Sequence, residues 1–284
     1  MKIGAVFPQT EIGAAPAGIR AYVEAIEAMG FDHLASYEHV LGAERRAGLN
    51  GPYGLEDQFH EVMVLFGYIA AITTRIELAT EVLVLPQRQT ALAAKQAAEI
   101  DILSGGRLRL GVGLGWNWVE YEALGADYRT RGRRVEEQVE LMRRLWTEPE
   151  ITFSGREHRI TAAGLRPLPG RLIPIWLGTT ADVGLRRAAR IADGWQSEVG
   201  YGPEAEAKVE SLRRYLDEEG RDASTFGIAA EVGPGDEGVR EAQAWQRLGA
   251  THISVTTMGL GLATVDEHVA SLIDFKRRWD ASAR

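Results

Sequence analysis

Short runs rich in β-forming residues recur along the chain, and amphipathic helical patterns separate them. In one such pattern Val135, Val139, Met142 and Trp146 follow one another at spacings of 4, 3 and 4 residues, which places these side chains on one face of a helix. Eight runs predict β-strands, each followed by a helical pattern: Lys2–Phe7, His33–Tyr37, Ile76–Leu85, Arg107–Val112, Ile173–Gly178, Gly194–Val199, Phe226–Glu231 and His252–Thr257.

Glycines and capping residues mark the ends of these elements. Gly30 follows the first helix, Gly249 precedes the last strand, and Thr264 with Glu267 has the spacing of a capping box. Parallel strands joined by helices form either an open doubly wound sheet or a closed barrel, and eight units over roughly 250 residues have the size of a barrel. We therefore predict an α/β fold, a single (β/α)8 TIM barrel domain over residues 1–284.

Residues 149–171 interrupt this alternation before the fifth strand. They contain the stretch TFSGREHRI, and Pro167 and Pro169 close the segment. The pattern predicts a short insertion, such as a hairpin, and not a second domain.

The composition narrows the functional classes. The chain has no cysteine, which excludes disulfides, thiolate metal sites and a cysteine nucleophile. Its net charge of -8 argues against a nucleic-acid surface, because binding of phosphates needs a basic face. No stretch is apolar enough to span a membrane, and the N-terminus enters a strand instead of a signal peptide, so we expect a cytoplasmic protein.

In a barrel of this kind the site lies at the carboxyl ends of the strands. His39 follows the second strand, and Glu38 lies beside it. A histidine there can carry a proton or hold a polar ring edge, although it could also bind only the backbone. The other five histidines have no metal-ligand spacing, so we predict no metal site. A glycosidase would need a carboxylate pair such as Glu120 and Glu231, and nothing fixes their separation.

The fourth strand ends in the stretch GVGLGWNW, in which Gly111, Gly113 and Gly115 alternate before Trp116 and Asn117. This is not the G-x-G-x-x-G dinucleotide motif, and no acidic residue about 20 positions further ends a second strand. Alternating glycines remove side chains from one face and would let a flat ligand approach the backbone. The alternative is a tight turn with the tryptophans packed as core.

The fifth strand ends at Gly178, and a helix begins directly after Thr179 and Thr180. Free amides at a helix N-terminus and two hydroxyls would then converge, which is the arrangement of an anion site. Alternatively, one of the two threonines is only the N-cap of the helix.

Four segments carry a family resemblance: GFDHLASYEHV (Gly30–Val40), RIELATEVLVLPQRQTALAAKQAAEIDILSGGRLRLGVGLGWNWVEYEALG (Arg75–Gly125), PIWLGTTADVGLRRAARIADGW (Pro174–Trp195) and GATHISVTTMGLGL (Gly249–Leu262). With these segments the chain resembles, nearly from end to end, the luciferase-like monooxygenase superfamily. Within it the chain resembles the oxidoreductases that use the deazaflavin coenzyme F420.

The resemblance implies cofactor-binding positions. Thr80, Glu81 and Val82 match a bulge that supports the flavin or deazaflavin ring, with a cis peptide expected between Glu81 and Val82. Glu38 and His39 match an acid–histidine pair, the candidate catalytic residues, although relatives usually have Asp in place of Glu38.

Two further segments match the cofactor site of the family. The cofactor-binding residues Gly113, Gly115, Trp116 and Asn117 belong to the glycine-rich end of the fourth strand. Gly178–Thr180 match the phosphate turn, where relatives commonly have a glycine at the position of Thr179. Some sugar-phosphate dehydrogenases of the family place a catalytic glutamate at the position of Trp116, so the resemblance does not support that activity.

The resemblance implies hydride transfer between F420 and an unidentified small organic substrate, with His39 as the proton donor. A deazaflavin carries hydride without activating oxygen, whereas bound FMN would permit monooxygenation with O2. An FMN-dependent monooxygenase is therefore the alternative, and a barrel that binds a cofactor without turnover is a third. A homodimer is also implied. An anionic cofactor tail would suit arginines at the barrel mouth, and the candidates are Arg45, Arg46, Arg88, Arg129 and Arg131.

Overall fold

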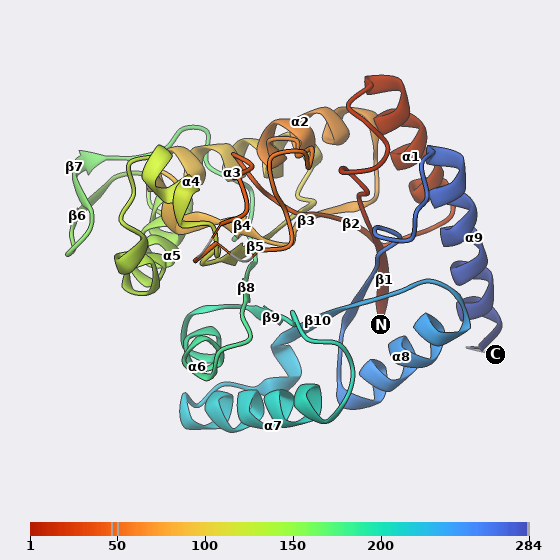
Figure 1. Ribbon diagram of the computed structural model, residues 1–284. Helices are drawn as coiled ribbons and strands as arrows, with labels where there is room; N and C mark the ends of the chain where they lie inside the picture. Colours follow the sequence, from red (N-terminus) through yellow and green to blue (C-terminus); the bar gives the residue numbers. More distant parts are fainter. Residues whose placement is uncertain (47, 50, 283–284) are drawn as a thin grey trace.

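A closed sheet of parallel strands forms the centre of the computed structural model, which describes residues 1–46, 48–49 and 51–282 (Figure 1). Neighbouring strands pair in parallel around the sheet, and pairing of β3 with β5 closes it. Among the described residues the barrel strands are β1 (Lys2–Val6), β2 (His33–Ser36), β3 (Glu77–Thr80), β5 (Leu108–Gly113), β8 (Ile175–Gly178), β9 (Gly194–Gln196), β10 (Gly227–Val232) and β11 (His252–Val255). The predicted (β/α)8 TIM barrel is confirmed.

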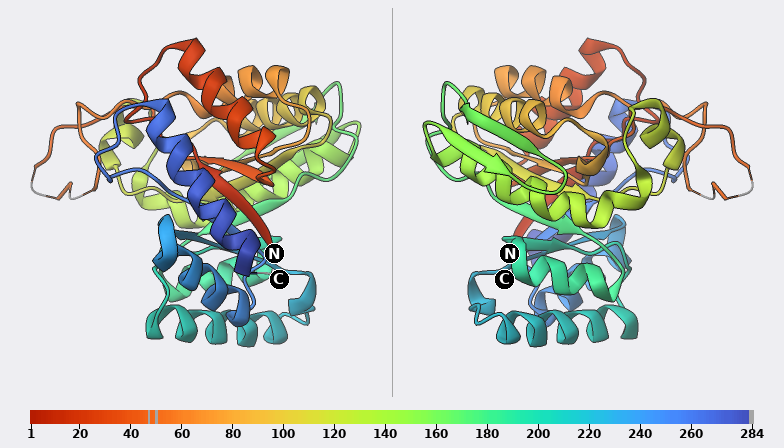
Figure 2. Two further views of the ribbon diagram at one scale, coloured as in Figure 1. Left: turned by 90° about the vertical axis from the view of Figure 1, so that its right-hand side faces the viewer. Right: turned by 90° about the vertical axis from the view of Figure 1, so that its left-hand side faces the viewer.

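Helices surround the barrel, as the two side views show (Figure 2). The helices are α1 (Pro16–Ala28), α2 (Val62–Ile72), α3 (Thr90–Ser104), α4 (Trp118–Ala123), α5 (Arg131–Thr147), α6 (Asp182–Ile191), α7 (Pro203–Glu218), α8 (Gly235–Leu248) and α9 (Val265–Ser282). Helix α3 buries Ala93, Ala94, Ala97 and Ala98, small side chains that let it lie close against α2 and α5. Of the helices in the described part of the chain, none is long and apolar enough to cross a bilayer.

The predicted capping box and the predicted glycine before the last strand agree with the structure. The backbone amide of Glu267 donates to Thr264 Oγ1 at 3.3 Å, and the amide of Thr264 donates to Glu267 Oε2 at 3.0 Å, which completes the predicted capping box. Gly249 ends α8 with a φ of 104°, a left-handed conformation that favours glycine.

The third predicted strand is interrupted. Instead of running continuously over Ile76–Leu85, the chain forms β3, then β4 (Leu83–Val84), with Glu81 and Val82 between them. The peptide bond between Glu81 and Val82 is cis, as the resemblance implied. The two residues between the strands belong to the mouth of the barrel.

Two segments depart from the strand–helix alternation. The predicted insertion contains an antiparallel hairpin of β6 (Ile151–Ser154) and β7 (Arg159–Ala163), which lies at the outer edge of the molecule (Figure 1). A long connection, residues 37–61, joins β2 to α2, and its described part forms no helix. The expectation that a helix directly follows every strand was wrong here. We call residues 37–61 the β2–α2 segment.

Candidate functional site

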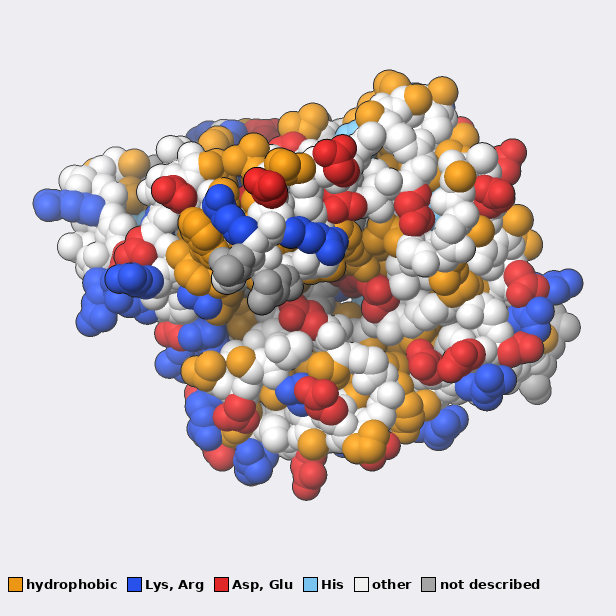
Figure 3. All heavy atoms as spheres, viewed as in Figure 1, with side chains coloured by type: hydrophobic (Ala, Val, Ile, Leu, Met, Phe, Trp, Pro, Cys, Tyr) orange, Lys and Arg blue, Asp and Glu red, His pale blue; other side chains and the backbone are white. Residues whose placement is uncertain are grey.

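A cavity of about 660 Å³ opens at the carboxyl ends of the barrel strands. On the molecular surface it lies near the hollow in the middle of the face shown in Figure 3, beside acidic side chains. Nine of the predicted site residues line it: Glu38, His39, Glu81, Val82, Gly115, Trp116, Gly178, Thr179 and Thr180. Thr80, Gly113 and Asn117 do not line it.

His39 is held by a buried carboxylate that the sequence did not connect to it. The Nδ1 atom of His39 lies 3.2 Å from Glu120 Oε2, and Glu120 is 1% exposed. Glu120 Oε1 accepts hydrogen bonds from the backbone amides of Val40 at 2.6 Å and Leu41 at 3.0 Å. Because Oε1 is occupied by these amides, Oε2 is left to accept Nδ1–H, which leaves the other ring nitrogen of His39 for the cavity.

Aromatic rings pack around the imidazole of His39. The ring centroids of Phe59, Trp116 and Tyr53 lie at 4.8, 5.3 and 5.5 Å from that of His39, all in edge-on arrangements. Phe59 and Tyr53 come from the β2–α2 segment, and Trp116 follows β5. Together with Glu120 these rings fix the orientation of the imidazole.

Glu38 has a different environment from its neighbour. Its Oε1 accepts from Arg88 Nε at 2.8 Å, and its Oε2 accepts from the amide of Val84 at 2.6 Å. Burial raises the pKa of Glu38, and the Arg88 guanidinium opposes that rise. Arg88 also donates to Glu61 at 2.6 Å. Arg88 was a candidate to bind the anionic cofactor tail, but in the structure two carboxylates engage its guanidinium.

The alternating glycines at the end of β5 and just after it make room for the chain itself. A Cβ atom on Gly113 would lie 2.3 Å from Val82 Cγ2, and one on Gly115 would lie 2.6 Å from Val84 Cγ1. A Cβ on Gly111 would meet a main-chain oxygen of the same interrupted strand at 2.0 Å. The space that the sequence suggested for a flat ligand is therefore occupied by residues 80–84, from the end of β3 through β4, and Gly115 alone of the three also lines the cavity.

The side chains of two residues that were predicted to bind the cofactor form hydrogen bonds with the backbone instead. The side chain of Asn117 caps α4, because its Oδ1 accepts from the amide of Val119 at 3.1 Å and its Nδ2 donates to the carbonyl of Leu41 at 3.2 Å. Thr80 Oγ1 donates to the carbonyl of Gly111 at 2.6 Å. Both residues support the wall of the cavity from behind.

The turn before α6 presents a helix N-terminus to the cavity. The N-cap residue is Ala181, with no capping side chain, so the alternative in which a threonine is the N-cap was wrong. Thr179 Oγ1 accepts from the amide of Ala181 at 3.2 Å, and a Cβ on Gly184 would lie 2.0 Å from that oxygen, so Thr179 packs on the helix. The Lys208 ammonium donates to the carbonyl of Thr180, which places a cation beside the turn.

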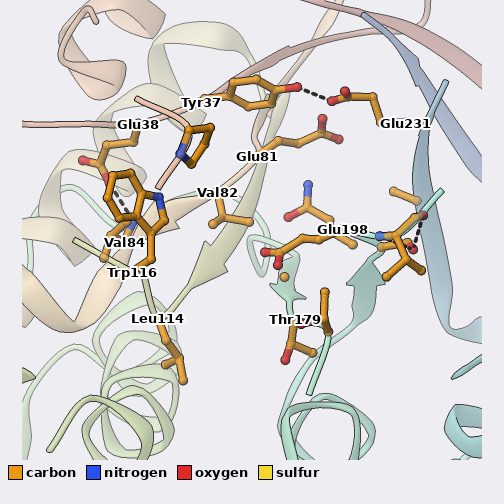
Figure 4. Close-up of a pocket in the computed structure, with 18 of the residues that line it drawn as sticks. Tyr37, Glu38, Glu81, Val82, Val84, Leu114, Trp116, Thr179, Glu198 and Glu231 are labelled. Carbon is orange, nitrogen blue, oxygen red and sulfur yellow. Dashed lines mark hydrogen bonds between the residues drawn. The ribbon is translucent and has the colours of Figure 1, made fainter. Parts of the chain in front are cut away.

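An acidic group occupies the other end of the cavity, where Figure 4 shows Tyr37, Glu81 and Glu231 together. The Tyr37 hydroxyl donates to Glu231, and Ser254 Oγ donates to Glu81 Oε1 at 2.9 Å. Burial and the negative charge of Glu81 raise the pKa of Glu231 to about 7. Burial also raises the pKa of Tyr37 well above its usual range. The only sequence signal for Glu231 was its position at a strand end, because its partners are remote in the chain.

Comparison with known proteins identifies one family. A family model described as luciferase-like monooxygenase matches residues 1–267. An uncharacterized protein of Mycobacterium tuberculosis is 40% identical over 164 residues, which cover 57% of this chain and 56% of that protein. The F420-dependent glucose-6-phosphate dehydrogenase of Segniliparus rotundus is 30% identical over 224 residues, which cover 76% of this chain and 64% of that protein.

A monooxygenase is also among the similar proteins. The pyrimidine monooxygenase of Variovorax paradoxus is 27% identical over 237 residues, which cover 78% of this chain and 62% of that protein. The chain therefore spans less than two thirds of the length of these curated relatives. The crystal structure of monooxygenase RslO1 from Streptomyces bottropensis covers 100% of both chains with a TM-score of 0.78 at 19% identity, a likeness of fold.

Proposed function

Since the chain belongs to the luciferase-like monooxygenase family, we propose that it is an oxidoreductase that transfers a hydride between coenzyme F420 and a small organic substrate. The relative from Segniliparus rotundus, whose name states F420 dependence, supports this choice of cofactor. The observation that carries the proposal is one cavity that joins the segment between β3 and β4, the N-terminus of α6 and His39.

The residues present fit a flat cofactor with an anionic tail. Val82 rests in the gap left by Gly113 and Gly178, since a Cβ on Gly178 would lie 2.7 Å from Val82 Cγ1, and this packing makes a firm support for one ring face. The amides that begin α6, with Lys208 beside Thr180, suit a phosphate group. A bound deazaflavin would supply or accept the hydride.

His39 provides the proton-transferring group in this proposal. Glu120 holds its Nδ1, so the imidazole is fixed in one orientation while Nε2 exchanges a proton with the substrate. Glu38 acts indirectly, because Arg88 and the amide of Val84 engage both of its oxygens. We assign it the positioning of the residues that follow β2.

Anaerobic titration of the purified chain with F420 and with FMN tests the proposal. We expect saturable binding of F420 and slow reaction of the reduced coenzyme with oxygen. On addition of a panel of small carbonyl and amine compounds, the F420 absorbance should change with turnover, and His39→Ala should abolish that change. Tight binding of FMN without binding of F420 would overturn the choice of cofactor.

An FMN-dependent monooxygenase is the second candidate. The 27% identity to the pyrimidine monooxygenase of Variovorax paradoxus favours it. It predicts oxygen uptake that depends on both reduced FMN and an organic substrate. Because F420 does not activate oxygen, measurement of oxygen uptake with each reduced cofactor separates the two candidates.

A further inference from the structure

The charged side chains of the cavity lining are acidic. Four glutamates line it, Glu38, Glu81, Glu198 and Glu231, and among the described residues that line it none is lysine or arginine. Arg88 neutralises Glu38 from behind. Three carboxylates therefore remain without a basic partner in the lining itself.

A buried arginine below the cavity compensates only part of this charge. Arg109 is 2% exposed, its Nε donates to Glu77 Oε1 at 2.7 Å, and its guanidinium opposes the rise in the pKa of Glu81. Glu231 accepts from the Tyr37 hydroxyl, a neutral donor, and no described basic side chain forms an ion pair with Glu231 or Glu198. Burial raises the pKa of Glu198 as well as that of Glu231, so these two carboxylates give the cavity its negative potential once the pH is high enough to ionise them.

Figure 4 shows Glu198 reaching into the cavity, opposite Trp116. Tyr37, Tyr53 and Trp116 supply aromatic surface to the same lining. Aromatic faces and carboxylates together attract organic cations, because both present negative charge to the ligand. Gln196 also lines the cavity, but its side chain packs against the barrel wall: its Nε2 donates to the carbonyl of Thr80 at 3.2 Å, and its Oε1 lies beside Gly111.

We propose that the substrate of this site is a small organic cation, an amine or a substituted ammonium or iminium group, held between Trp116 and the carboxylates of Glu198 and Glu231. The proposal rests on the hydride-transfer function given above and specifies its substrate class. The carboxylate end of the cavity repels anions, so sugar phosphates and carboxylic acids bind weakly there, whereas the anionic cofactor tail belongs at the α6 turn beside Lys208. A neutral molecule of the same shape gains the contacts with the aromatic rings and loses the attraction to the two carboxylates.

A matched pair of ligands tests this directly. Choline and 3,3-dimethylbutan-1-ol have the same shape and differ in that a positively charged nitrogen replaces a neutral carbon. Isothermal titration calorimetry of the full chain at pH 8, with and without saturating cofactor, gives both affinities. We expect choline to bind at least about tenfold more tightly, and glucose 6-phosphate to bind more weakly than either.

Variants locate the source of the preference. Glu198→Gln and Glu231→Gln are each expected to reduce the preference for choline about threefold or more, and the affinity for the alcohol should change little. Glu210→Gln, on the exposed face of α7, is the matched control and should leave both affinities unchanged. Glu198 accepts no hydrogen bond among the described contacts, so its variant tests the proposal even if Glu231→Gln folds poorly.

Two results would overturn the inference. One is that choline binds no more tightly than the alcohol, including the case in which neither binds. The other is that both cavity variants keep the full preference. The outcome is separable from the function itself: turnover with F420 without a preference for cations contradicts only the substrate class, whereas a preference for cations without F420 binding contradicts only the choice of cofactor.

Discussion

Replacement of Gly113 by alanine directly tests how the glycines of β5 support the cavity wall. The new Cβ would lie 2.3 Å from Val82 Cγ2, more than about 1 Å inside ordinary carbon contact. Gly113 is buried in β5 and Val82 packs against it from the segment between β3 and β4, so the overlap has to be relieved by movement of Val82 or of the β5 backbone. We expect a loss of about 2 kcal/mol in the free energy of unfolding, the usual range for an extra methyl group in a packed site.

A second substitution identifies the cause of that loss. Val82→Ala removes the colliding methyl group and alone lowers stability by about 1 kcal/mol, since Val82 is only partly buried. If the overlap is responsible, the double variant Gly113→Ala with Val82→Ala is more stable than the sum of the single losses predicts, by at least about 1 kcal/mol. Cofactor affinity should fall in Gly113→Ala and recover in the double variant.

Urea unfolding followed by tryptophan fluorescence measures these free energies. Gly67→Ala in α2 is the matched control, because a Cβ at Gly67 meets no atom within 4 Å, and this substitution should raise helix stability by up to about 1 kcal/mol. The packing argument is refuted if Gly113→Ala is as stable as the unmodified chain. Additive losses in the double variant would refute it equally.

Three further outcomes follow from the site. Glu120→Gln cannot accept Nδ1–H of His39 in the same way, so kcat should fall at least about tenfold with a smaller change in KM and a shifted pH profile, measured by steady-state kinetics. Burial raises the pKa of Glu231 from 4.5 to about 7, so the folded protein holds this proton more tightly than the unfolded chain does. The resulting stabilisation is fully present below pH 4.5 and is lost as the pH rises to about 7. Glu231→Gln should remove up to about 3 kcal/mol of this pH dependence, measured by urea unfolding across pH 4 to 8. Arg88→Met leaves Glu38 buried without its partner and should destabilise the fold by about 3–5 kcal/mol, and Arg88→Met with Glu38→Leu should recover most of that loss in thermal unfolding.

The barrel could be predicted from local patterns because each of its units is recorded in a continuous stretch of sequence. A run such as His252–Thr257, followed by the capping box at Thr264, identifies a strand and the start of the next helix without reference to the rest of the chain. The interruption of the third strand was not visible in the periodicity of Ile76–Leu85, because it depends on space provided by glycines in a different strand. The family resemblance supplied it instead.

The site could be predicted only in part, because its contacts also join residues that are far apart in the sequence. Glu38 and His39 are neighbours in the sequence, and the pattern treated them as one pair, yet Arg88 engages the first and Glu120 the second. The contact between His39 and Glu120 joins residues 81 positions apart, and the one between Tyr37 and Glu231 joins residues 194 positions apart. Such partners are set by the closure of the barrel, which one-dimensional spacing does not encode.

The β2–α2 segment gives the protein a modular route to new chemistry. It brings Pro52 and Tyr53 to the cavity, while the support formed by Val82 and the turn at Thr179 belong to the barrel. Laboratory grafting of residues 42–58 alone would therefore exchange the Pro52 and Tyr53 side of the cavity. His39 and its partners Glu120 and Phe59 would stay in place.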